Sequence, residues 1–170
     1  WAELRNKYDR VDAAVLNISG WYDEAYGPEG AATNFIGLVA VRRGQPDLRA
    51  KLVIGPWVHG ADATAETKSG EREFGPTARI DYDELVLRWM DRYVRGLANG
   101  VEQGRPVRVF VMGANVWREA DAWPLEATRC TPLFLAASAG DRKGGKLSWE
   151  IPQEAEGSSA FVSDPADPVV

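Results

Sequence analysis

An aspartate and a histidine stand where an acid–base pair could form. Asp23 follows the short apolar run of residues 13–18 (AAVLNI), and His59 follows a second run at residues 51–54 (KLVI). Each lies five positions past its run, in a loop that also holds glycine and aromatic residues. An aspartate that fixes the tautomer of a histidine and stabilises its imidazolium form supplies two members of a nucleophilic triad. The spacing therefore points to proton transfer at these two loops.

Both residues also have ordinary structural interpretations. Asp23 could equally be a turn or helix-capping residue, and Glu24, Asp9 and Asp12 are competing carboxylates. A lone histidine is more often a surface or structurally satisfied side chain. His59, however, is the only histidine of the chain and lies in a loop bounded by Gly and Pro. Because loops on a rigid scaffold often carry function, this position favours a functional role. The order Asp before His is also the order in α/β-hydrolases.

The segments before the two loops are predicted to be neighbouring strands of a parallel sheet. The run 13–18 is short and nearly all apolar, as in a strand buried on both faces. Between the two runs, a helix is predicted to begin at Pro28 and to end by Gly44 and Pro46. Its apolar stripe consists of Ala31, Ala32, Phe35, Leu38 and Val39. Strand, helix and strand indicate a right-handed βαβ unit, which would bring both loops to one edge of the sheet.

A second helix is predicted after the polar connection at residues 60–79. Asp81, with Glu84 three residues later, forms a start like a capping box. Apolar and aromatic residues then keep helical spacing as far as Leu97, where Gly96 and Gly100 supply the stop. We expect this stripe to pack against the sheet rather than to form a ligand platform.

Beyond residue 104 the pattern changes to short strands. Residues 107–112 alternate, and further strand candidates occur at residues 133–136, 147–151 and 160–162, between turn-rich clusters. Such spacing is typical of a β-sandwich or jelly roll. The expected fold class is therefore α/β, with a parallel-sheet domain over residues 1–103 and an incomplete jelly-roll β-sandwich over residues 104–170.

The composition excludes several classes of function. The net charge of −5 comes without a basic stripe, which makes nucleic acid a poor partner. The longest apolar runs span only a few residues, so we expect no transmembrane helix. The single cysteine, Cys130, permits no intrachain disulfide and, with one histidine, no zinc site built on Cys and His. The sequence assigns no cellular compartment.

Four stretches of the chain together resemble the CocE/NonD family of serine hydrolases. They are VLNISGWYDEAYGPEGAATNF, KLVIGPWVHG, the amphipathic helix that ends in glycine, and VRVFVMGANVWREADAWP. The family includes cocaine esterase, Xaa-Pro dipeptidyl-peptidases, α-amino acid ester hydrolases and glutaryl acylases. The terminal SDPADPV (residues 163–169) resembles a signature of the family's jelly-roll domain.

The resemblance implies roles for several residues. Asp23 and His59 would be the acid and the base of the triad, while Trp21, Tyr22 and Trp57 could line the acyl pocket or pack beneath the loops. The chain would be the C-terminal part of an α/β-hydrolase domain with the start of the jelly roll. Its first ten residues would be the tail of the family's cap.

The chain also departs from the family's pattern. No G-x-S-x-G nucleophile motif is present, and the nearest string, AASAG at residues 136–140, lacks the first glycine and follows both Asp23 and His59. We reject that string as the nucleophile. Positions 25 and 26, where α-amino ester hydrolases carry substrate-binding acids, are Ala and Tyr here, which disfavours α-amino specificity.

The sequence therefore predicts part of a serine hydrolase that cleaves an ester or amide through an acyl-enzyme. Its substrate would be a small ester or a short peptide, and its partner would be the remainder of its own chain, with the serine and the cap. No metal or organic cofactor is expected. The chain alone should be inactive. The alternative is a non-catalytic binding module built on the β-sandwich, in which Asp23 and His59 are incidental loop residues.

Overall fold

The computed structural model describes residues 7–25, 27–137, 145–152 and 164–166. The chain divides into two compact units, Trp1–Glu126 and Ala127–Val170, and each is described by itself.

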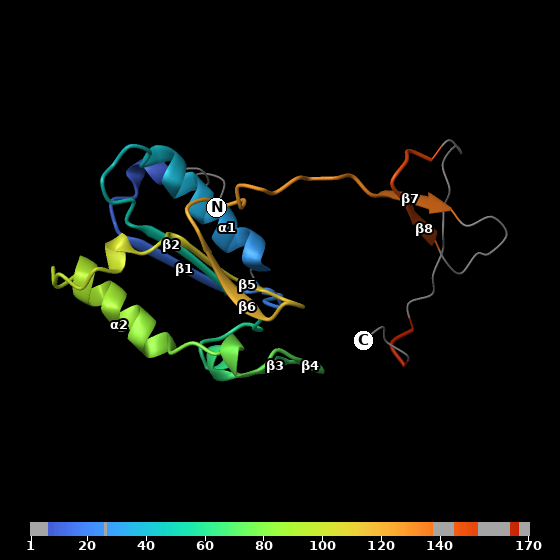
Figure 1. Cartoon of the computed structure of the whole chain (residues 1–170), viewed down its shortest axis with the longest axis horizontal. Helices are drawn as coiled ribbons and strands as arrows, with labels where there is room; N and C mark the ends of the chain where they lie inside the picture. Colours follow the sequence, from blue (N-terminus) through green and yellow to red (C-terminus); the bar gives the residue numbers. More distant parts are fainter. Residues whose placement is uncertain (1–6, 26, 138–144, 153–163, 167–170) are drawn as a thin grey trace. The chain divides into compact units, whose positions relative to one another are not determined.

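A four-stranded sheet forms the centre of the first unit, with the strand order β1-β2-β5-β6 (Figure 1). β1 (Val15–Gly20) and β2 (Ala50–Gly55) are parallel, and β2 is also parallel to β5 (Val107–Val111). β6 (Val116–Ala120) is antiparallel to β5. The parallel pair β1–β2, joined by a helix, confirms the predicted βαβ unit. Both strands therefore end at the same edge of the sheet.

Helix α1 (Gly27–Val41) covers one face of this sheet. Ala32, Phe35 and Leu38 of the predicted stripe are buried against Leu52, Ile54, Val107 and Val109 of the strands. Ala31 and Val39 pack at the margin of the same cluster. This burial confirms the predicted stripe and fixes the two strands whose ends carry the candidate site.

Helix α2 (Tyr82–Tyr93) lies on the opposite side of the sheet from α1 (Figure 1). It begins as predicted, because the Asp81 side chain accepts a hydrogen bond from the Glu84 amide at 2.8 Å. It ends earlier than the predicted Leu97, since the chain leaves the helix after Tyr93. Of the predicted stripe only Trp89 is buried within the helix, whereas Met90 is exposed. The stripe is thus only partly covered within the part of the chain that the structure describes.

The two strands β5 and β6 lie in the sheet of the first unit. Residues 107–112 were expected to open a separate sandwich after residue 103, but β5 pairs with β2 and its Val107, Val109 and Phe110 are buried. The charged edge strand β6 was not predicted at all. A turn with positive φ at Gly113 and Asn115 folds it back onto β5. The first unit therefore continues to Glu126.

Short elements complete the first unit. They are the 3₁₀ helices η1 (Tyr8–Arg10), η2 (Asp62–Ala65), η3 (Pro76–Ala78) and η4 (Val101–Gln103), and the two-residue strands β3 (Lys68–Ser69) and β4 (Arg72–Glu73). In the described ranges, the chain contains no helix with the length and apolar character that a membrane crossing needs.

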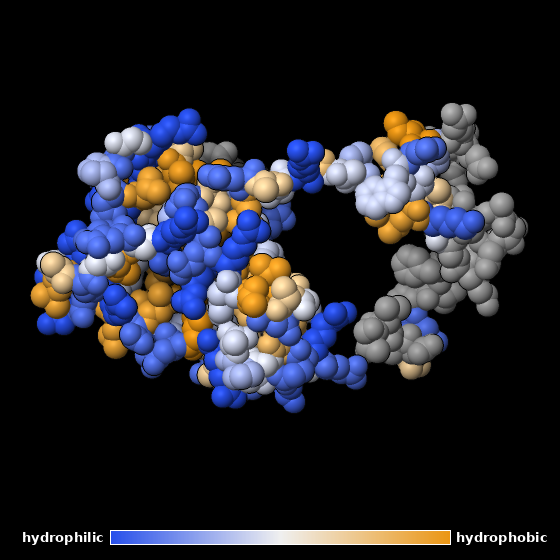
Figure 2. All heavy atoms as spheres, in the orientation of Figure 1, coloured by the Kyte–Doolittle hydropathy of each residue, from blue (hydrophilic) through white to orange (hydrophobic). Residues whose placement is uncertain are grey.

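In the second unit, the described residues include an antiparallel hairpin, β7 (Phe134–Ala137) with β8 (Gly145–Ser148). Leu135 and Leu147 are partners across the pair, and both are exposed. Figure 2 shows hydrophobic side chains, in orange, on the surface of this unit. The predicted strand at 133–136 is confirmed, and that at 147–151 begins and ends earlier than expected. The candidate at 160–162 lies outside the described residues. Because the described residues of this unit show only the pair β7–β8, the jelly roll stays a prediction.

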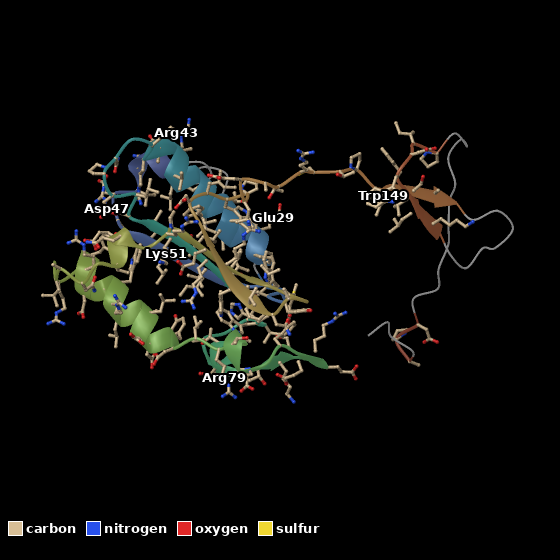
Figure 3. The ribbon with its side chains drawn as sticks, in the orientation of Figure 1. Glu29, Arg43, Asp47, Lys51, Arg79 and Trp149 are labelled. Carbon is tan, nitrogen blue, oxygen red and sulfur yellow. The ribbon has the colours of Figure 1, made fainter. Side chains whose placement is uncertain are left out.

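The phenol of Tyr93 provides a pH-dependent test of how α2 is anchored. Its hydroxyl donates to Asp47 Oδ1 at 3.0 Å, in the loop before β2 (Figure 3). Burial, with the adjoining Asp47 carboxylate, raises the pKa of Tyr93 above its ordinary value. The neutral phenol is therefore the favoured form, and its contribution to stability is complete below about pH 10 and is lost as pH rises further.

Ultraviolet absorbance should consequently show a late ionisation phase that belongs to Tyr93. In the Tyr93→Phe variant this late phase should be absent, whereas it should persist in the control Tyr82→Phe. A late phase that survives in Tyr93→Phe would contradict the assignment.

Candidate active site

Two loops continue the pairing of β1 and β2 beyond the ends of the strands. The Trp21 amide donates to the Gly55 carbonyl oxygen at 2.8 Å, and the Tyr22 amide donates to the Trp57 carbonyl oxygen at 3.0 Å. The loops therefore run side by side as extensions of the ladder. This arrangement brings Asp23, in the loop after β1, close to the loop after β2.

Gly20 makes this approach possible, because a methyl group at its position would overlap the carbonyl of Trp57. We expect Gly20→Ala to destabilise the protein by about 3 kcal/mol, since backbone atoms cannot yield as a flexible side chain can. Chemical denaturation followed by circular dichroism measures the change. Gly30→Ala, in α1 with open space around the added methyl, is the matched control and should be neutral or stabilising. Equal stabilities of the two variants would show that the loops do not need the close contact.

Asp23 and His59 meet at the edge of the sheet. His59 Nδ1 lies 3.1 Å from Asp23 Oδ1. The Asp23 side chain is only 10% exposed, whereas that of His59 is 57% exposed. Asp23 Oδ1 also accepts the Ala25 amide at 3.2 Å, and its Oδ2 accepts the Ser19 hydroxyl at 3.3 Å. The arrangement is a sheltered, oriented carboxylate beside an accessible imidazole.

The contact between Asp23 and His59 Nδ1 gives the two ring nitrogens of His59 different roles. If neutral His59 carries its proton on Nδ1, that N–H donates to Asp23 and leaves Nε2 as the acceptor of the ring. Such a histidine can take a proton at Nε2 while the carboxylate stabilises the resulting imidazolium. The pair is thus able to act as a general base.

A cavity of about 250 Å³ adjoins the pair. Asp23, His59 and Trp57 contribute to its wall. So do three residues that the sequence interpretation did not single out, Ser19, Thr64 and Tyr82. Ser19 could have been found as the polar residue at the end of a buried strand. Thr64 and Tyr82 come from the connection after His59 and from the start of α2, and nothing local in the sequence marks them.

The three aromatic residues predicted to line an acyl pocket differ in their surroundings. Trp57 is buried, borders the cavity and donates through Nε1 to the Ala78 carbonyl oxygen at 3.0 Å. Trp21 donates through Nε1 to the Phe110 carbonyl oxygen at 2.8 Å, and Tyr22 packs against Phe74. These are packing contacts that hold the loops. Substrate contact by Trp21, Tyr22 and Trp57 stays a prediction.

Other predicted features of the site fall partly outside the described residues. Tyr26 is one of them, and so is Ser138 of the rejected AASAG string. Among the described residues, no group of three or more His, Cys, Asp or Glu side chains is arranged to hold a metal ion.

Comparison with known proteins relates the chain to a group of hydrolases. The chain is 34% identical over 161 residues to cocaine esterase of Rhodococcus sp. (strain MB1 Bresler). The alignment covers 91% of this chain and 26% of the esterase. A solved α-amino acid ester hydrolase superposes with a TM-score of 0.64 at 28% identity, over 96% of this chain and 27% of that one.

An aminopeptidase from a marine sediment archaeon, Thaumarchaeota archaeon, shares the fold with a TM-score of 0.63 at 23% identity, over 94% of this chain and 24% of that one. The chain thus spans about a quarter of the length of these proteins. No protein-family model matches it. Over most of its length, nevertheless, the chain is related to the esterases and other hydrolases of the CocE/NonD family.

Proposed function

We propose that the chain supplies the acid and the base of a serine hydrolase that cleaves an ester or amide. The observation that supports this most directly is the 3.1 Å contact between Asp23 Oδ1 and His59 Nδ1. Both side chains follow adjacent parallel strands, at the edge where catalytic groups collect in open α/β sheets. The relationship to esterases agrees with this chemistry.

In the proposed reaction, a serine hydroxyl attacks the carbonyl carbon of the substrate while His59 Nε2 takes the hydroxyl proton. Asp23 holds the ring and stabilises its positive charge. His59 then gives the proton to the leaving alcohol or amine, which departs and leaves an acyl-enzyme. Water, deprotonated by His59, releases the acid and restores the serine.

The serine and the oxyanion donors would come from the remainder of the protein. The 170 residues contain no G-x-S-x-G motif, and the chain corresponds to about a quarter of the length of its relatives. We therefore propose that this chain alone is inactive. We also propose that the hairpin β7–β8 opens a second, jelly-roll domain, with the boundary near Glu126.

The proposed substrate is a small ester or a short peptide. Trp57 is the aromatic residue best placed to touch it, because it borders the cavity beside His59. Ala25 stands close to Asp23 in place of an acid, so nothing at that position would bind a substrate ammonium group.

Labelling with a fluorophosphonate tests the proposal, because this reagent modifies serines activated by a neighbouring base. In the longer protein, we expect one labelled serine, located before Trp1 in a G-x-S-x-G sequence. The 170-residue chain by itself should stay unlabelled. A longer protein without a reactive serine would refute the assignment.

A second candidate is a binding module centred on the second unit. The observation in its favour is the exposed apolar surface of the hairpin, formed by Leu135, Leu147, Trp149 and Ile151. Trp149 stands out from this unit in Figure 3. This function would be preferred if fluorophosphonate finds no reactive serine and the intact coding sequence lacks the nucleophile motif.

A further inference from the structure

We propose that Ser19 is a positioning residue that locks the Asp23 carboxylate toward His59. The inference rests on the proposed function, since it assigns a part in the same proton transfer. The two carboxylate oxygens of Asp23 have different partners. Oδ1 faces His59 Nδ1 and the Ala25 amide, while Oδ2 accepts the Ser19 hydroxyl at 3.3 Å.

Burial explains why the second oxygen needs a protein donor. The Asp23 side chain is only 10% exposed, so bulk water has little access to it. A carboxylate removed from water is costly unless protein donors replace its hydration. Ser19 is itself only 8% exposed, and its hydroxyl supplies such a donor. The contact therefore stabilises the anionic form that the proposed mechanism requires.

The position of Ser19 in the sheet explains why this donor can orient the carboxylate. Ser19 lies within β1, paired with Ile54 of β2, whereas Asp23 lies in the following loop. A hydroxyl on a paired strand moves less than one on a loop. Anchoring Oδ2 from the strand restricts rotation of the carboxylate and keeps Oδ1 directed at the ring of His59.

The contact is long for a hydrogen bond between a hydroxyl and a carboxylate. Hydrogen bonds of catalytic groups are often long in unliganded enzymes and tighten as charge develops. We expect the Ser19 contact to shorten when His59 becomes positive. Because Ser19 directs its proton to Asp23, it acts as a positioning residue and not as a nucleophile.

Kinetics of the longer protein provide the first test. Ser19→Ala should lower kcat for ester hydrolysis about tenfold with KM nearly unchanged, because the charged transition state loses more than the bound substrate. Ser19→Thr, which keeps the hydroxyl, should recover most of kcat. Fluorophosphonate should still label Ser19→Ala at the same serine. Unchanged kcat in Ser19→Ala would overturn the inference. Loss of fluorophosphonate labelling in Ser19→Ala would also overturn it, if Ser19 proves to be the residue that is labelled in the wild type.

The tautomer of His59 provides a second test that needs no activity. His59 is the only histidine of the 170-residue chain, so ¹⁵N NMR of the neutral ring reports on this site alone. We expect the Nδ1–H tautomer to dominate in the unaltered chain and to decrease in Ser19→Ala, with recovery in Ser19→Thr. An unchanged tautomer ratio in Ser19→Ala would refute the positioning role.

Asn17→Ala is the matched control for both tests. Asn17 is also a buried polar residue of β1, and its side-chain amide donates to the Lys51 carbonyl oxygen at 3.1 Å, away from Asp23. Its replacement should lower stability without altering the tautomer. If the longer wild-type protein has no reactive serine but Ser19→Ala still alters the tautomer ratio, the proposed function is refuted and the positioning role of Ser19 is supported. If the wild type is active and Ser19→Ala changes neither kcat nor the tautomer ratio, the proposed function is supported and the positioning role is refuted.

Discussion

Replacing His59 with alanine in the longer hydrolase is expected to reduce kcat/KM for an ester substrate by about ten-thousand-fold or more. The side chain is the proposed acceptor of the serine proton and the donor to the leaving group, and the chain has no second histidine to substitute for it. Because the His59 side chain is 57% exposed, its replacement should change stability little, so the loss of activity can be assigned to catalysis. Steady-state hydrolysis, with circular dichroism of each variant, measures the effect.

Two neighbouring carboxylates supply a matched pair for the same experiment. Asp23→Asn keeps the shape of the side chain but removes the charge that stabilises the imidazolium, so a loss of similar order, about ten-thousand-fold, is expected. Glu24→Gln alters the adjacent, exposed carboxylate and should leave the rate within about twofold. Activity of His59→Ala or Asp23→Asn within tenfold of the wild type would contradict the assignment of the pair.

The parts of this site that the sequence predicted are those that depend on local pattern. The apolar runs at residues 13–18 and 51–54 and the stripe of α1 follow from burial on both faces of a sheet, and they place Asp23 and His59 at one edge. Chain order and loop position made the two residues a candidate pair, and the family resemblance implied their roles. Their side chains do meet.

What the sequence did not predict depends on contacts between segments far apart in the chain. β5 alternates like a strand of a sandwich, yet it pairs between β2 and β6, and α1 covers its Val107 and Val109, which no local pattern reveals. In the sequence, Ser19 resembles any other strand residue, and only the folded structure places its hydroxyl within hydrogen-bond distance of Asp23. The cavity wall likewise needs Thr64 and Tyr82, whose positions are set by tertiary packing.

Arg42 is a buried charged residue that contacts the segments before two strands of the first unit. It follows α1 directly and is only 2% exposed. Its guanidinium donates to four backbone carbonyl oxygens at 2.7–3.1 Å, those of Val11, Ala13, Leu48 and Arg49. These carbonyls lie just before β1 and β2, so one side chain ties the starts of both strands to the end of α1.

Replacing Arg42 with methionine should therefore destabilise the protein by about 3–5 kcal/mol, because four part-buried carbonyl groups lose the donors of one buried guanidinium together. Arg42→Lys should recover only part of this loss, since an ammonium cannot reproduce the planar fork that serves two segments at once. The adjacent exposed residue gives the control, Arg43→Met, with an expected change within about 0.5 kcal/mol (Figure 3). Urea denaturation of the three variants measures the differences. If Arg42→Met and Arg43→Met unfold at the same urea concentration, the four hydrogen bonds do not stabilise the first unit. If only Arg42→Met is destabilised, these hydrogen bonds hold the starts of β1 and β2, the two strands that Asp23 and His59 follow.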